Sequence, residues 1–359
     1  DPAGVLPISG TSDFALVASL VIVTAYDYKL TRITDTAGRD IALDYYPDGR
    51  LKTITDFAGR VWRYNYNGSN LVTVTKPATS QYPSGVSSSY TYDGSHNLVS
   101  GVNARGQTFV VNEYDADDRV FRQTYCGGTA TLAYDTTARK TTVTDRKGFV
   151  TVWTYDVLGH VTQQEDRTAG LRSGEPVSYM TTYTYNKHGE VATVRFPRGN
   201  GVKYTYNENH ADPRSRGNLL TIRRKTSMAA ADSSTNDLIA TLTYESRFNQ
   251  IKTARDPKNY LYTCVFDYEL PTSDPRYSDK GSLVQIQQPS VGGQIPVTNL
   301  HYNAFGQVVK IIDPNNSVTE YDYFSPTGYL KEVRRDPVSV NAVTRMTYDA
   351  IGNLATVTD

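Results

Sequence analysis

An alternation of aromatic and polar positions recurs along the chain and predicts short β-strands. Tyr64 and Tyr66 are separated by one polar residue, as are Tyr183 and Tyr185. Because successive side chains point to opposite faces of a strand, each Tyr-x-Tyr segment places both rings on one face. A second segment, rich in Thr, Val and Ile, follows each of them, so the pattern predicts strands in pairs.

Turn residues separate the predicted strands. Gly49 and Gly68 directly follow Asp or Asn, whereas Gly159 and Gly189 stand three residues after Asp or Asn. These residue types accept the positive φ angles of hairpin turns. Another turn with a leading Asp, such as Asp313-Pro314, ends the second strand and fits a type I turn. Each unit is therefore predicted to be a β-hairpin.

The hairpin unit recurs about fourteen times at a basic spacing of about 21 residues, which indicates a repeat protein. The sequence thus predicts an all-β fold, an array of hairpins in one wound, curved sheet. We assign no residue to catalysis, to a cofactor or to a metal. We assign a structural role in the repeats to Tyr26, Tyr28, Tyr46, Gly49, Tyr64, Tyr66, Gly68, Tyr92, Tyr114, Tyr155, Gly159, Tyr183, Tyr185, Gly189, Tyr206, Tyr302, Gly306, Tyr321, Tyr323, Gly328, Tyr348 and Gly352.

The chain divides into a short N-terminal segment and the array. Residues 1–25 are expected to form a strand segment or the remnant of a preceding repeat, with a buried strand over the apolar run 14–23, which is too short to span a bilayer. Because the chain starts at Asp1 and not at Met, we expect it to be a part of a longer protein. Residues 26–359 form the array, with insertions expected near 168–180, 208–217, 226–240 and 270–298.

The number of strands predicts a winding sheet. About 28 strands spaced by ~4.8 Å make a sheet ~130 Å wide, whereas open twisted sheets curl or split beyond ~10 strands. A single ring of that circumference would be ~40 Å across with a wall ~25 Å tall, so this chain can form an arc or one ring but no sealed container. Both edges would expose unpaired strands, which favours self-association or a longer array.

The spacing within the second strand leaves one question open. Leu51 and Ile54 are three residues apart, as are Leu71 and Val74. Strict alternation would place the members of each pair on opposite faces. Either both faces of the sheet bury something, or a β-bulge resets the alternation.

The amino-acid composition argues against some classes of function. The chain has 37 Lys and Arg against 37 Asp and Glu, so no net field attracts nucleic acid, and membrane insertion by this segment is not expected. It contains 28 Tyr but only 10 Phe and 2 Trp. Because the tyrosine hydroxyl needs water or a partner, this composition favours half-wet sheet faces over a deep apolar core.

Candidate chemical groups are better explained as parts of turns and strands. The five histidines lack the spacing of a metal site, and the two cysteines lie outside any CxxC motif. The acidic segment 115–118 lacks the rest of an EF-hand, so Asx turns are expected there and at Asp35 and Asp56. The basic run 223–225 is predicted to be a solvated strand edge. The residues considered are His96, His160, His188, His210, His301, Cys126 and Cys264.

The Tyr-x-Tyr-Asp/Asn-x-x-Gly-x-Leu/Val units, followed by Asp-led turns, resemble the YD repeats of the Rhs family from about Tyr26 to Asp359. This family includes Tc toxin C subunits, polymorphic toxins and teneurins. The resemblance implies that the repeats spiral into part of a hollow β-shell, secreted or at the cell surface. Bacterial members enclose a toxic C-terminal polypeptide, and teneurins use the shell for adhesion.

We therefore expect a non-enzymatic wall segment that encapsulates a toxin or effector within a larger secreted protein. Its partners would be the rest of its own polypeptide and an enclosed C-terminal cargo. The alternative is a teneurin-like adhesion module that binds protein or carbohydrate. The family's self-cleaving Asp-Pro-x-Gly-Leu motif is matched only in part, by residues 1–5, which we interpret as a repeat turn because Asp-Pro recurs at Asp256, Asp313 and Asp336.

Overall fold

The computed structural model describes residues 29–35, 38–168, 172–232, 235–325, 327–349 and 354–359. Tyr26, Tyr28, Gly352 and the apolar run 14–23 lie outside these residues. The strands are β1 Arg32–Thr34, β2 Asp40–Tyr45, β3 Leu51–Thr55, β4 Val61–Asn67, β5 Asn70–Thr75, β6 Ser87–Tyr92, β7 Leu98–Val102, β8 Thr108–Tyr114, β9 Val120–Tyr125, β10 Gly128–Asp135, β11 Lys140–Thr144, β12 Val150–Tyr155, β13 Val161–Arg167, β14 Ser178–Tyr185, β15 Val191–Arg195, β16 Gly201–Tyr206, β17 Leu219–Lys225, β18 Leu238–Tyr244, β19 Ile251–Arg255, β20 Leu261–Phe266, β21 Leu283–Gln287, β22 Val297–Tyr302, β23 Val308–Ile312, β24 Val318–Tyr323, β25 Leu330–Arg335, β26 Ala342–Tyr348 and β27 Leu354–Thr358.

The strands form one antiparallel meander. Each strand pairs with its neighbours in the chain, from β1–β2 through β26–β27, and together they make a 27-stranded sheet. Two short 3-10 helices, η2 (Pro213–Ser215) and η3 (Asp267–Glu269), lie in connections between strands. The predicted all-β array of hairpins in a single curved sheet is confirmed.

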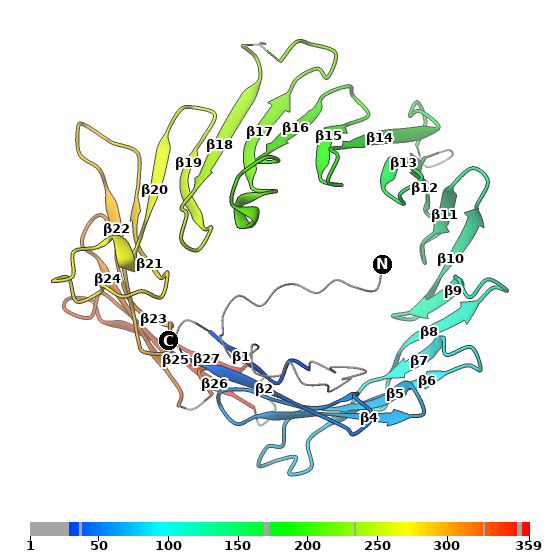
Figure 1. The fold of residues 1–359 in the computed structure, drawn as a ribbon, viewed down its shortest axis with the longest axis horizontal. Coiled ribbons are helices and arrows are strands. Elements are labelled where there is room, and N and C mark those ends of the chain that lie inside the picture. Colours follow the sequence, from blue (N-terminus) through cyan, green and yellow to red (C-terminus); the bar gives the residue numbers. More distant parts are fainter. Residues whose placement is uncertain (1–28, 36–37, 169–171, 233–234, 326, 350–353) are drawn as a thin grey trace, which may run out of the picture.

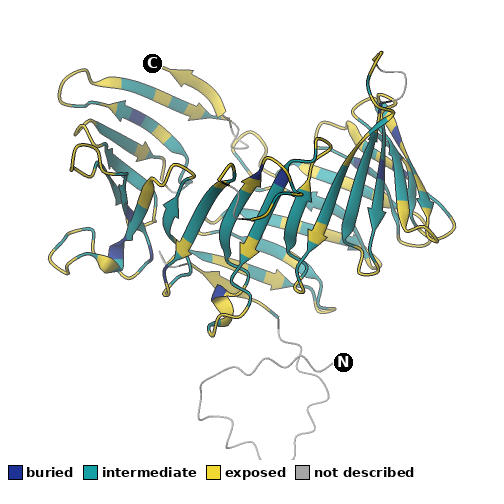
Figure 2. Cartoon of the chain, turned by 90° about the horizontal axis from the view of Figure 1, so that it is seen from above, coloured by how far each residue is buried: buried dark blue, intermediate teal, exposed yellow. Residues whose placement is uncertain are grey.

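The sheet winds around an open centre (Figure 1). The first strands and the last strands meet after a full turn, where the β3–β4 connection contacts the β24–β25 connection. About 21 strands lie between these connections, so at ~4.8 Å per strand the turn has a circumference of ~100 Å and a width of ~30 Å. The strands shift along the axis of the ring as they wind, and the C-terminal strand lies at one end of the sheet in the view from above (Figure 2).

A β-bulge in the second strand of the hairpins resolves the spacing of the apolar residues. Tyr45 pairs with Leu51, but Asp44 pairs with Thr53, so one residue of β3 is extra. This extra residue resets the alternation, and Leu51 and Ile54 share a face. The same shift occurs in the pairs β4–β5, β6–β7, β8–β9, β12–β13, β14–β15, β16–β17, β18–β19, β20–β21, β22–β23, β24–β25 and β26–β27.

Tyrosine hydroxyl groups join many of the hairpins to the hairpin before. The tyrosine at the end of the first strand of a hairpin donates a hydrogen bond of 2.7–3.1 Å to a backbone carbonyl near the start of the second strand of the preceding hairpin. The ring is thereby packed on the sheet while its hydroxyl is satisfied. The bonds run from Tyr92 to Leu71, Tyr114 to Leu98, Tyr134 to Val120, Tyr185 to Val161, Tyr206 to Val191, Tyr244 to Leu219, Tyr302 to Leu283 and Tyr323 to Val308.

The sheet has almost no deep core. Most strand residues are of intermediate burial (Figure 2), and among the described residues only five apolar side chains are buried. This agrees with the tyrosine-rich composition, because tyrosine favours half-wet surfaces. The five are Ala130, Val152, Phe266, Val284 and Val333.

One sequence-based assignment is corrected by the strand register. Tyr45 occupies the position opposite the bulge, whereas Tyr46 belongs to the turn whose Gly49 donates to the Tyr46 carbonyl. Residues 270–298 were expected to be one insertion but contain β21, which pairs with β20 and β22. Its alternating residues 283–287 satisfy the strand pattern, which the surrounding Pro, Ser and Gly residues obscured.

Candidate functional site

The first and second turns of the winding sheet meet at a contact that we call the seam. It joins the turn 56–60, between β3 and β4, to the connection between β24 and β25. Arg60 Nη1 donates a 3.0 Å hydrogen bond to Tyr329 Oη, and the guanidinium carbon lies 5.4 Å from the centre of the Tyr329 ring. A cation over an aromatic face is attracted to its π-electrons, so both contacts favour closure of the ring.

Hydrogen bonds within its own turn position Arg60 for the contact with Tyr329. Asp56 Oδ1 accepts hydrogen bonds from the backbone N–H groups of Ala58 and Arg60 at 3.0 and 2.9 Å. Asp56 Oδ2 accepts from Arg60 Nε at 2.6 Å. Gly59 supplies the positive φ of 73° that closes the turn. The guanidinium is therefore positioned by its own turn.

The same Asx turn explains the acidic segment at 115–118. Asp115 Oδ1 accepts from the backbone N–H groups of Asp117 and Arg119, each at 3.0 Å. The side chain of Arg119 also donates to Asp115 and lowers the pKa of this carboxyl group. The Asx turns expected at Asp56 and Asp115 are confirmed, and the carboxylate oxygens are engaged with the protein's own donors.

A cavity of about 680 Å³ lies at the seam and is lined by residues of both turns of the sheet. Trp62 and Lys76 come from the first turn, and Tyr329 and Tyr348 from the second. Tyr329 and Tyr348 stack with ring centres 4.8 Å apart. A smaller cavity of about 200 Å³ shares Phe324 with it and is also lined by Phe57, Phe305, Gln307 and Gly328. Both cavities are therefore lined by aromatic side chains.

The connection 76–86 between β5 and β6, which supplies Lys76, was not among the expected insertions. Its signal was present as the widened spacing between Tyr66 and Tyr92 and the residues Pro77, Pro83 and Gly85. Proline and glycine clusters indicate loops. The sequence contains no signal that would place this loop beside residues about 250 positions later, because that proximity follows from the width of one turn of the sheet.

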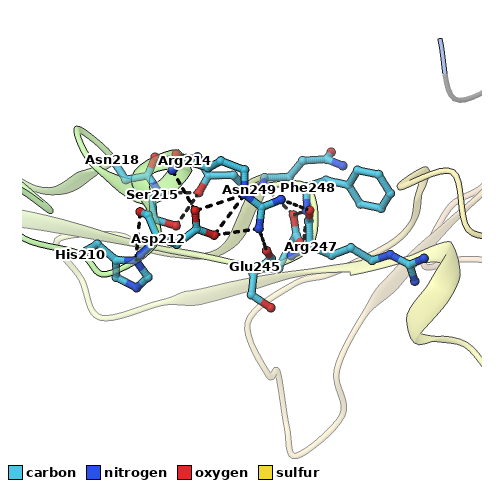
Figure 3. A network of polar contacts seen from close by, with 11 residues as sticks. His210, Asp212, Arg214, Ser215, Asn218, Glu245, Arg247, Phe248 and Asn249 are labelled. Carbon is cyan, nitrogen blue, oxygen red and sulfur yellow. Dashed lines mark hydrogen bonds and ion pairs between the residues drawn. The ribbon is translucent and has the colours of Figure 1, made fainter. Parts of the chain in front are cut away.

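A second polar region joins the loops 207–218 and 245–250 (Figure 3). Arg214 donates to the backbone carbonyls of Ser246 and Arg247 at 3.1 and 3.0 Å, and Asn249 Nδ2 donates to the Arg214 carbonyl at 2.6 Å. Asp212 orients Arg214, whose side-chain and backbone hydrogen bonds lower the pKa of Asp212 to about 2. These bonds hold one rim of the sheet in a defined shape.

Glu245 forms the buried centre of this rim. Its carboxylate accepts hydrogen bonds from the backbone N–H groups of Arg247, Phe248 and Gln250, and from Tyr268 Oη at 2.6 Å. Burial favours the neutral acid, but these donors outweigh it and lower the pKa of Glu245. Burial and the bond to Glu245 raise the pKa of Tyr268. The geometry is that of a structural anchor, with every carboxylate oxygen held by donors.

The basic run 223–225 is not a solvated strand edge, so that prediction is wrong. Strand β17 lies between β16 and β18, and the side chain of Lys225 is only 1% exposed. Its Nζ lies 3.2 Å from Asp237 and 3.1 Å from Asp232, and Arg223 is 3.0 Å from Asp237. The acidic residues come from the insertion after β17, which folds back over the strand and pairs the charges that burial would otherwise leave uncompensated.

The other residues singled out in the sequence lie in turns and strands. His160 stacks on Tyr185 with ring centres 4.7 Å apart, and His96 occupies the positive-φ turn position, with φ 68°, in place of Gly94. Cys126 is exposed and Cys264 is half-buried, with its pKa raised by burial. Within the described residues, no three His, Cys, Asp or Glu side chains form a group that could hold a metal. Of the glycines assigned a structural role in the repeats, Gly49, Gly68, Gly159, Gly189, Gly306 and Gly328 have positive φ.

Comparison with known proteins identifies the repeat. Residues 45–81, which span strands β3 to β5, match the RHS Repeat family model. Residues 45–81 therefore carry an Rhs repeat. The resemblance seen in the Tyr-x-Tyr units is therefore confirmed. No curated protein matches the chain in sequence.

The Rhs-repeat sheet has the fold of part of a larger toxin assembly. It matches the Photorhabdus luminescens Tc holotoxin pore with 13% identity and a TM-score of 0.54, over 90% of this chain. It matches TcdB2-TccC3-Cdc42 and TcdB2-TccC3 without its hypervariable C-terminal region with 13% identity, a TM-score of 0.55 and the same coverage. The chain spans 18% of the length of each matched chain. In the described residues, no helix has the length and hydropathy needed to cross a membrane.

Proposed function

We propose that this Rhs-repeat chain is a non-catalytic wall segment of a shell that encloses a polypeptide within a larger secreted protein. The observation that carries the proposal is the seam, where the contact between Arg60 and Tyr329 joins connections that lie a full turn apart in the winding sheet. A wall of strands that are hydrogen-bonded to one another has no gaps between neighbouring strands, and it excludes macromolecules from the space that it encloses.

The match to a part of the TcdB2-TccC3 structures supports this proposal at the level of fold. A wall of one turn with a height of one strand cannot enclose a folded domain by itself. The proposal therefore requires further turns of the same sheet, supplied by the rest of a longer polypeptide, and the cargo would be a C-terminal segment of that polypeptide.

The test is expression of the full-length parent protein with its native C-terminus, followed by denaturing gel electrophoresis, native co-purification and limited proteolysis. We expect a C-terminal fragment that stays with the shell and resists protease until the shell is denatured. The same proteolysis is carried out on a protein that carries both Arg60→Met and Tyr329→Phe, as the control for the contribution of the seam. A C-terminus that is digested at the rate of the denatured sample would contradict enclosure.

A second candidate is an adhesion or interaction module, and the rim of Figure 3 favours it. Arg214, Asn249 and Glu245 hold the loops in one conformation through side-chain to backbone hydrogen bonds, and a preorganised surface loses little entropy on binding. Deletion of residues 208–217 should then abolish partner binding on cells and leave the protease resistance of an enclosed cargo unchanged. Unchanged cell binding after the deletion would contradict this role.

A further inference from the structure

We propose that the cavity at the seam binds a small planar aromatic molecule that carries a carboxylate, sulfonate or phosphate group. Trp62, Tyr329 and Tyr348 would contact the ring, and Lys76 would contact the anion. Neither closure of the wall nor enclosure of a cargo requires a ligand here, so the inference stands independently of the proposed function. It rests on the shape of the cavity, on its aromatic lining and on its charge.

The size and lining of the cavity fit a small aromatic ligand. A volume of about 680 Å³ lies in the usual range of ligand pockets, ~300–1,000 Å³. Phe324 meets Tyr348 edge to face with ring centres 6.3 Å apart, and Tyr348 stacks on Tyr329. Trp62, from the other turn of the sheet, lines the same space. A planar ring inserted between these groups gains offset stacking or edge-to-face contacts.

The charge of the cavity favours an anion. The guanidinium of Arg60 is already neutralised by Asp56 at 2.6 Å and bonded to Tyr329. Lys76 is exposed and lines the cavity, and it has no ion-pair partner among the described residues. The one acidic residue of the lining, Asp349, already interacts within the chain. The Lys76 ammonium is therefore available to a ligand in the cavity, and an ammonium group forms short, charge-assisted hydrogen bonds with oxyanions.

The loop that holds Lys76 has a defined conformation. The Lys76 N–H donates to the Val86 carbonyl at 2.9 Å, and the Thr79 N–H donates to the Tyr82 carbonyl at 3.0 Å. Gly85 has a φ of 78°, and a Cβ at this position would collide with the Lys76 carbonyl oxygen. The close approach and the positive φ both require glycine. The base of Lys76 is thus fixed beside the cavity, which lowers the entropy cost of binding.

A ligand in this cavity would contact both turns of the sheet. Trp62 and Lys76 belong to the first turn, and Tyr329 and Tyr348 to the second. Any molecule that binds only the closed seam stabilises it by mass action. The ligand would therefore act as a second clamp beside the Arg60–Tyr329 contact.

The test uses two fluorescent probes that differ in charge. The anionic probe is 8-anilinonaphthalene-1-sulfonate, and its uncharged analogue is N-phenyl-1-naphthylamine. The chain has 2 Trp, so Trp153→Phe leaves Trp62 as the sole tryptophan donor for energy transfer to a probe in the cavity, excited at wavelengths where the 28 Tyr do not absorb. We expect one saturable site for both probes. Lys76→Met should weaken the sulfonate probe about tenfold and leave the uncharged probe within about twofold, because only the sulfonate loses its charged partner.

Two controls complete the test. Lys147→Met removes an exposed lysine from a different turn and should change neither probe. Trp62→Leu in the presence of Trp153 should weaken both probes, measured by equilibrium dialysis, while circular dichroism confirms the fold. Binding of the sulfonate probe that is equal in Lys76→Met and the parent, or energy transfer from Trp62 that shows no saturation, would overturn the proposal.

Discussion

The Arg60 guanidinium donates a 3.0 Å hydrogen bond to the Tyr329 hydroxyl although the two residues are 269 positions apart in the chain. Every strand pairing in the sheet joins strands that are neighbours in sequence. The contact between Arg60 and Tyr329 therefore reports whether the first and second turns of the sheet meet, which no strand pairing does.

Removal of both seam partners should show coupling between them. Arg60→Met also removes the bond to Asp56, so we propose a double-mutant cycle with Tyr329→Phe. The coupling energy should be about 0.5–1.5 kcal/mol, the usual net value of a hydrogen bond. Urea unfolding of the four proteins gives the value. Arg39→Met is the matched control, since Arg39 has the same turn position, bonds to Asp35 and lies over Phe57, but should show no coupling to Tyr329.

The tyrosine hydroxyl bonds between hairpins should contribute to stability one by one. Tyr302→Phe removes the 2.7 Å bond to the Leu283 carbonyl and leaves that partly buried acceptor short of a donor. We expect a loss of about 1 kcal/mol in the free energy of unfolding. Tyr321→Phe is the control, because the Tyr321 hydroxyl has no hydrogen-bond partner among the described residues. Equal losses in the two variants would show that the hydroxyl bond contributes nothing specific.

Backbone strain, and not lack of space, should dominate substitutions at the turn glycines. Gly159 has a φ of 86° and no atom within 4 Å of the position that a Cβ would occupy, whereas Gly94 has the same open surroundings without a positive φ. Gly159→Ala should therefore lower stability by about 1–2 kcal/mol, and Gly94→Ala by much less. Thermal unfolding distinguishes the two. Gly159→Asn should recover part of the loss, because Asn tolerates the left-handed region.

The pair Asp274 and Arg276 should make stability depend on pH. Side-chain and backbone hydrogen bonds from Arg276, with Nη2 at 2.8 Å from Oδ2, lower the pKa of Asp274 to about 2. Since the folded state has the lower pKa, the stabilisation is complete above the ordinary value of 3.8 and is lost as the pH falls toward 2. The difference in urea midpoint between the parent and Asp274→Asn should be largest above about pH 5 and should shrink toward pH 2. A constant difference would contradict the linkage.

The hairpins, their order and their pairing could be predicted from local sequence patterns. Tyr64-x-Tyr66 and the turn from Asp56 to Arg60 specify a strand and a reversal through contacts within a few residues. When each strand pairs with the next strand in the chain, local patterns are enough to determine an antiparallel meander. The requirement that so wide a sheet winds also followed from counting strands.

The bulge position, the burial of Lys225 and the seam depend on contacts that no local pattern specifies. The bulge that places Leu51 and Ile54 on one face is defined by the register of β3 with β2. Lys225 is buried because Asp237, from the insertion after β17, forms an ion pair with it. The meeting of Arg60 and Tyr329 depends on the twist and curvature added by each strand over a full turn. A local pattern specifies each strand pair, but small angles summed over about 21 strands determine which distant residues meet.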